Sequence, residues 1–137
     1  MTSDSTQSEK SLAEMTVQDI YLELIRRTQF NEFDGEKVYG SLMLHRDLWQ
    51  AVIMESAFGA GMEPAGLMKL RDISQDFWHV DTLYILTENS ATAHKFVEII
   101  EAEGWAEEIT IYDDEEDVQE AFGDSGAQGA IISIWWD

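Results

Sequence analysis

Acidic side chains follow three apolar segments of this chain, at the points where strands are expected to end. These residues are Glu88, Asp113, Asp114 and Asp137. If the strands are parallel, their carboxyl ends share one edge of the sheet, which is where ligands bind in open α/β folds. Convergent carboxylate oxygens are ligands that Mg²⁺ accepts, usually together with waters and substrate phosphate. The sequence therefore predicts a Mg²⁺ site suited to phosphate binding or phosphoryl transfer.

A second interpretation of these carboxylates needs no metal. Asp and Asn directly after a strand are common helix N-caps, and acidic residues are favoured in the first turn of a helix. Asp113 and Asp114 precede such a turn, which contains Glu115, Glu116 and Asp117. Because 28 of the 137 residues are Asp or Glu, carboxylates occur at any edge of the fold. Helix capping and a generally acidic surface therefore remain the alternative to a metal site.

Other patterns typical of enzymes do not occur in the sequence. The chain has no cysteine, which excludes disulfides, thiolate nucleophiles and cysteine-based zinc sites. The Gly-rich segment 59–64 lacks the third glycine of a dinucleotide fingerprint and the Gly-Lys-Ser/Thr of a phosphate-binding loop. No Gly-x-Ser-x-Gly elbow occurs, and the three histidines form no zinc-type pair. The motifs identify no family, and we expect a non-enzymatic binding or regulatory module.

The charge of the chain is strongly negative. There are 28 acidic and 8 basic residues, which gives a net charge of -20, and no Lys or Arg follows Lys95. This charge repels nucleic-acid phosphates and anionic lipid. The acids are interleaved with apolar residues, as in proteins adapted to concentrated salt, where the Debye length falls to about 3 Å at 1 M. We expect a halophilic, cytoplasmic protein; an acidic decoy for a basic nucleic-acid-binding protein is the alternative.

Length and composition indicate one folded domain. Apolar residues make up 45% of the sequence, which is enough to form a core. Residues 1–14 are polar and are expected to be a disordered leader, and residues 15–137 are expected to form a single α/β domain. No segment approaches the roughly 20 apolar residues that span a bilayer, and the first residues do not resemble a secretory signal. We expect no membrane association.

The first half of the domain is predicted to be mainly helical. Thr16 and Asp19 have the spacing of a capping box, and apolar residues then recur at helical spacing, which predicts a helix over 17–30. The segment 37–58 is ambiguous. A strand over 38–44 followed by a helix over 48–58 is favoured, and a hairpin or one long helix are the alternatives. A further helix is expected over 65–75, after Pro64.

The second half alternates strands and helices. Strands are predicted over 80–86, 109–112 and 130–136, and helices are predicted between them, ending at Gly104 and Gly123. This βαβαβ order predicts a largely parallel sheet. Adjacent strand residues point to opposite faces, so Trp135 and Trp136 cannot share one pocket. Core packing of both rings is one interpretation, and an outward ring is the other. An outward tryptophan suggests a contact surface, and we therefore expect a homo-oligomer or a protein partner.

Overall fold

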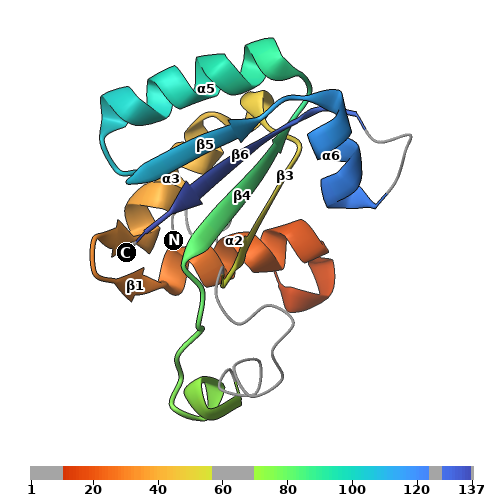
Figure 1. Ribbon diagram of the computed structural model, residues 1–137. Helices are drawn as coiled ribbons and strands as arrows, with labels where there is room; N and C mark the ends of the chain where they lie inside the picture. Colours follow the sequence, from red (N-terminus) through yellow and green to blue (C-terminus); the bar gives the residue numbers. More distant parts are fainter. Residues whose placement is uncertain (1–10, 57–69, 124–127, 137) are drawn as a thin grey trace.

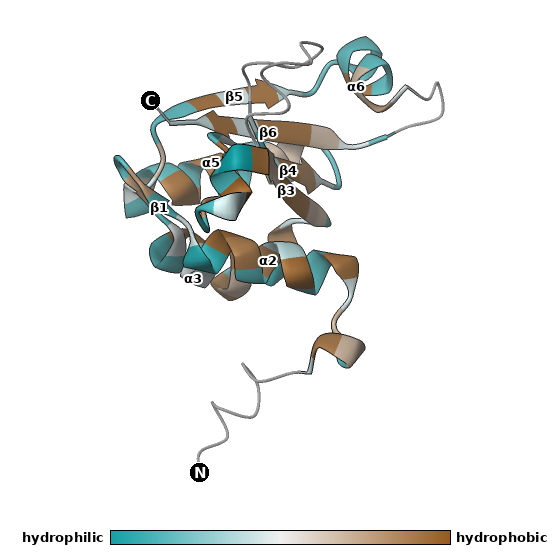
Figure 2. Ribbon diagram, turned by 90° about the horizontal axis from the view of Figure 1, so that it is seen from below, coloured by the Kyte–Doolittle hydropathy of each residue, from teal (hydrophilic) through white to brown (hydrophobic). Residues whose placement is uncertain are grey.

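Three helices cover one face of a four-stranded sheet in the part of the chain that the computed structural model describes, residues 11–56, 70–123 and 128–136. Figure 2 shows α2 and α3 on one side of the sheet and α6 on the opposite side. The elements in chain order are η1 (Leu12–Glu14), α2 (Val17–Arg27), β1 (Gln29–Phe30), β2 (Phe33–Asp34), α3 (Gly35–Leu44), η2 (Arg46–Leu48), β3 (Ala51–Glu55), β4 (Thr82–Thr87), α5 (Ser90–Glu103), β5 (Glu108–Tyr112), α6 (Glu115–Phe122) and β6 (Ala130–Trp135). Residues 70–74 are also helical.

The sheet is antiparallel throughout, so the predicted largely parallel sheet is wrong. Its strand order is β3-β4-β6-β5, and every neighbouring pair is antiparallel. The small sheet of β1 and β2 is antiparallel as well. β4 and β5 do run in the same direction with α5 between them, as a βαβ unit predicts. The prediction fails because β6 inserts between these two strands in the opposite direction (Figure 1).

The predicted strand over 38–44 and the predicted helix over 48–58 are both wrong. Residues 35–44 form α3, whose N-cap Asp34 accepts hydrogen bonds from the backbone N–H groups of Glu36 and Lys37. Gly35 fits where no other residue does, because a Cβ there would lie 2.1 Å from the carbonyl oxygen of Ile25. The strand of this region is β3, in which Val52 and Met54 are buried and Ile53 and Glu55 are exposed.

The capping signals correctly mark several helix ends. Thr16 and Asp19 form the predicted capping box at α2, and Asn89 caps α5 by accepting from the backbone N–H of Thr92 at 2.8 Å. Gly104 and Gly123 end α5 and α6 with φ of 76° and 64°, values that favour glycine. The predicted leader over 1–14, the Gly-rich segment 59–64 and the predicted helix over 65–75 lie wholly or partly outside the described residues.

The core lies between the sheet and the three helices α2, α3 and α5. Ile132 and Ile134 of the central strand β6 are fully buried there. Trp136 is 1% exposed; its ring packs edge-on against Phe33, with centroids 4.7 Å apart, and is stacked with Trp105 at 6.3 Å. Trp135 is half-buried on the opposite face. The two adjacent tryptophans therefore point to opposite faces, as expected for a strand.

One carboxylate connects the end of α5 to α3. Glu103 accepts hydrogen bonds from the Ser41 hydroxyl at 2.5 Å and from the Trp105 indole at 2.9 Å, and it lies 3.0 Å from Nε2 of His45. Burial raises the pKa of Glu103, but the hydrogen bonds from Ser41, His45 and Trp105 together outweigh burial and leave this pKa below its ordinary value. The ionised carboxylate therefore stabilises the packing of α3 on α5.

A side-chain amide covers the exposed edge of the sheet at β3. The Gln18 amide donates from Nε2 to the carbonyl oxygen of Val52 at 2.9 Å and accepts from the Val52 N–H at 2.8 Å. These two bonds take the place of a neighbouring strand at this residue. An edge strand with free backbone groups is a template for unwanted pairing, so Gln18 both anchors α2 and protects the edge.

We predict that Gln18→Leu lowers the free energy of unfolding by about 1–3 kcal/mol, because it leaves two backbone groups of Val52 without their partner. Urea unfolding in concentrated salt measures the change. Gln50→Leu is the matched control, since Gln50 is an exposed glutamine directly before β3. An equal loss of stability in the two variants would show that the amide contacts contribute nothing.

We predict that Glu103→Gln is less stable than the wild type at neutral pH, by about 1 kcal/mol. The folded-state pKa of Glu103 is lower than the ordinary value of 4.5, so its contribution is complete above pH 4.5 and is lost as the pH falls through the folded-state pKa. The stability difference should therefore close in acid. Urea unfolding between pH 7 and pH 3 measures it, with Glu101→Gln on the same helix as control. A difference that does not change with pH contradicts the assignment.

Candidate binding groove

The face of the sheet turned away from α2, α3 and α5 is rich in apolar and aromatic side chains. Residues that lie directly opposite in an antiparallel pair share a face, and so do residues two apart on one strand. We call the resulting set the outer face: Ala51, Ile53, Glu55, Thr82, Tyr84, Leu86, Glu108, Thr110, Tyr112, Ile131, Ser133 and Trp135. Ile53 is 40% exposed and Tyr112 is 41% exposed. The described helices therefore leave part of this face open.

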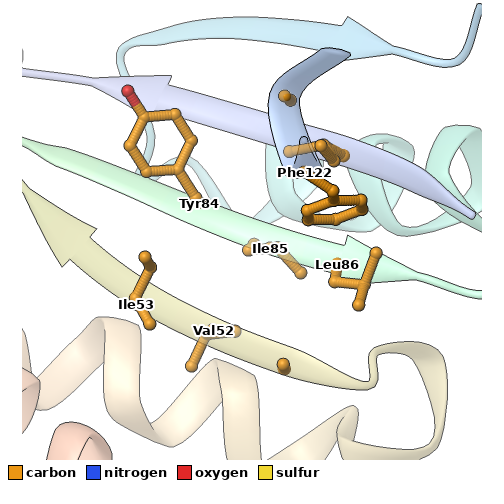
Figure 3. A pocket seen from close by; sticks show the side chains of 9 residues that line it. Val52, Ile53, Tyr84, Ile85, Leu86 and Phe122 are labelled. Atoms are coloured by element: carbon orange, nitrogen blue, oxygen red, sulfur yellow. The ribbon is translucent and has the colours of Figure 1, made fainter. Parts of the chain in front are cut away.

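A groove of about 420 Å³ lies on the outer face between the sheet and α6 (Figure 3). Its floor comes from β3, β4 and β6, and its wall comes from the last turn of α6. Phe122 of α6 reaches over β4 near Leu86, and Tyr84 stands further along the same strand. The lining residues are Ala51, Val52, Ile53, Tyr84, Ile85, Leu86, Ala121, Phe122 and Ile131.

The position of α6 creates the wall of the groove. Val118 is 1% exposed, whereas Phe122, one turn further on, is 44% exposed. Ile131 is the first residue of β6 on the outer face, and it is 8% exposed. The helix thus buries one end of the outer face and ends at Gly123 before it reaches the other end, so the Phe122 ring borders an open space.

Tyr84 carries the one polar side-chain group among the nine lining residues. Burial raises the pKa of the Tyr84 hydroxyl above 10, and Tyr112, Asp81 and Glu55 add to this effect. The hydroxyl therefore stays protonated at neutral pH, when it can donate or accept one hydrogen bond. A lining of this kind is suited to holding an apolar molecule and to orienting it through one polar contact.

The structure brings only part of the predicted metal site to one edge. β4 and β5 end at the same edge, which places Glu88, Asp113 and Asp114 there. β6 runs the other way, and its last residue Trp135 pairs with the first residues of β4 and β5. Asp137 lies outside the described residues, but the strand before it ends at the opposite edge. The reason for expecting four convergent carboxylates was the parallel sheet, and that reason no longer holds.

Two of these carboxylates have local hydrogen-bond partners. Asp114 caps α6 by accepting from the backbone N–H of Glu116 at 2.8 Å. Asp113 accepts from the Ser90 hydroxyl at 2.8 Å and lies 3.3 Å from Nε2 of His94, and the bonds from Ser90 and then His94 lower its pKa. In the described part of the chain, no group of three or more His, Asp or Glu side chains has the arrangement of a metal site. Mg²⁺ binding stays a prediction.

A second polar cluster lies just before β4. Asp72 is 6% exposed and accepts from the Arg71 guanidinium at 2.9 Å, while its other oxygen lies 2.7 Å from Nδ1 of His79. The Arg71 guanidinium lowers the pKa of Asp72, and the His79 contact lowers it further against the effect of burial. The Phe77 ring packs edge-on against the imidazole, with centroids 6.1 Å apart. This cluster ties the helical residues 70–74 to the segment that enters β4.

The sequence analysis missed the groove, although β4 carried a signal for it. Leu83 and Ile85 are fully buried on the inner face, and Tyr84 and Leu86 are apolar or aromatic on the outer face. A strand that is apolar on both faces is covered on both sides or borders a binding surface. The segment 80–86 was predicted only to be a strand, without regard to what covers its two faces.

No helix in the described residues is both long enough and apolar enough to cross a membrane.

Comparison with known proteins adds no further identification. No protein-family model, no curated protein and no solved structure matches this chain.

Proposed function

We propose that this protein is a non-enzymatic binding module that holds a small apolar molecule in the groove between the outer face and α6. The observation that carries this proposal is the groove itself, which is about 420 Å³ in volume and whose described lining residues are all apolar apart from the Tyr84 hydroxyl. Small-molecule sites are typically apolar hollows of about 300–1,000 Å³ with a few polar groups that fix orientation.

The size of the groove favours a small molecule over a protein partner. Nine of the described residues line it, whereas a stable protein interface uses about 20–30 residues on each side. A net charge of -20 also makes the approach of a second copy unfavourable unless salt screens it. Self-association, which the outward tryptophan suggested, therefore stays a prediction and is not needed for the proposed function.

The distribution of acids supports solvent adaptation over a decoy role. Exposed acids lie on α3 and α5 on one side of the sheet and on α6 on the other. A decoy of nucleic acid needs one contiguous acidic face, and acids on both sides do not favour that arrangement. We therefore propose that the protein works in concentrated salt, where self-repulsion is screened.

If the protein is adapted to concentrated salt, its free energy of unfolding should rise as KCl increases from about 0.1 M to 2 M, since the Debye length falls over that range. Urea unfolding at each salt concentration, followed by tryptophan fluorescence, measures this. Stability that stays constant or decreases with salt would contradict the halophilic assignment and leave the acidity to be explained as a binding surface.

We predict that Ile53→Gln weakens the binding of the neutral dye Nile Red by about threefold to tenfold, because it replaces an apolar lining side chain by a polar one. Fluorescence titration in 2 M KCl measures the affinity. Met43→Gln is the matched control: Met43 is 43% exposed against 40% for Ile53, and it lies on α3, away from the groove.

Each outcome of this titration decides something. Tight binding that is weakened only by Ile53→Gln supports the proposal. No saturable binding to the wild type contradicts it, as does equal weakening by both variants. A protein that sediments as a dimer and excludes the dye would show that a second copy covers the groove, and would also overturn the proposal.

A further inference from the structure

We infer that the groove selects apolar molecules that carry a positive charge, such as a quaternary ammonium or a protonated amine, over anionic molecules with the same apolar body. This inference rests on the proposed function, because it names the class of ligand that the groove takes. Two separate features support it: the negative charge of the surrounding elements and the aromatic rings that border the groove.

The elements that build this side of the molecule have no basic residue. β3, β4, β5, β6 and α6 contain no Lys or Arg. Their six acidic residues are Glu55, Glu108, Glu115, Glu116, Asp117 and Glu120. Basic side chains in the described residues lie instead on α2, α3, η2, α5 and the segment 70–74. A carboxylate or sulfate that enters the groove therefore meets repulsion without a compensating cation from these elements, whereas a cation is attracted.

Two aromatic rings border the groove. Tyr84 and Phe122 both line it, and Figure 3 shows their rings on β4 and α6, above the same stretch of sheet. Tyr112 and Trp135 lie further out on the same face. The face of an aromatic ring attracts an organic cation, and quaternary ammonium groups are commonly recognised in this way. An apolar floor, aromatic rings and an acidic surround match a ligand with an apolar body and a cationic head.

Salt separates these two contributions. Attraction to the acids of α6 acts over several ångströms and weakens when the Debye length falls to about 3 Å at 1 M salt. Contact between a cation and a ring acts at short range and is screened much less. In concentrated salt, the preference for a cation should therefore depend mainly on the rings of Tyr84 and Phe122.

The experiment compares three probes that share an octyl chain: octyltrimethylammonium, 1-octanol and octanoate. Displacement of Nile Red from the full chain in 2 M KCl gives their affinities. We expect the cation to bind about threefold to tenfold more tightly than the alcohol, and octanoate to bind most weakly. Phe122→Leu should weaken the binding of the cation more than that of octanol, and so remove most of the advantage of the cation.

Phe77→Leu is the matched control, because Phe77 is 41% exposed against 44% for Phe122 and lies outside the groove. Its affinities for all three probes should equal those of the wild type. Tyr84→Phe keeps the ring and should keep the preference for the cation.

Failure of this inference can be distinguished from failure of the proposed function. If octanoate binds as tightly as octyltrimethylammonium, the charge preference is wrong while the groove remains a binding site. If Phe122→Leu and Phe77→Leu weaken the cation equally, the role of the Phe122 ring is wrong. If none of the probes displaces the dye and the dye itself does not bind, the proposed function fails as well.

Discussion

The insertion of β6 between β4 and β5 is the constraint on which the rest of the structure depends. β6 is the only strand in the described sheet that pairs with both β4 and β5. β6 runs opposite to both strands, so it begins at the edge of the sheet where β5 ends. The chain between β5 and β6 therefore does not have to cross the inner face. α6 is therefore free to lie on the outer face, while α2, α3 and α5 share the inner one (Figure 2). The groove exists because this single short helix covers only part of the outer face.

The sequence predicted helix ends well and strand direction badly. Capping depends on neighbours in the chain, so the helix ends at Thr16 and Gly104 could be read directly. Strand direction depends on where the chain returns, and a nearly all-apolar β6 looks the same in a parallel or an antiparallel sheet. α3 was mistaken for a strand because its apolar run masks the helical spacing of Val38 and Leu42. The close approach of Gly35 to Ile25 could not be read from sequence at all.

The candidate site was missed for a related reason. Carboxylates were chosen as candidate ligands because of their chemistry. In a chain of net charge -20, however, carboxylates are common and an exposed apolar surface is the exception. Asp113 and Asp114 have local partners in Ser90 and the start of α6. By contrast, Ile53 and Phe122 are large apolar side chains that remain 40% and 44% exposed beside a common groove. Acidic residues occur throughout the chain, whereas the apolar groove is a local feature.

The most direct test of the groove is methyl NMR of the Ile- and Leu-labelled protein in concentrated salt, titrated with octyltrimethylammonium. Binding in the groove predicts that the methyl signals of Ile53, Leu86 and Ile131 shift together and saturate, while those of Leu42 and Ile100 in the core do not move. Saturable shifts confined to Ile20 and Leu24 on α2, or no saturable shift at any methyl group, would contradict it.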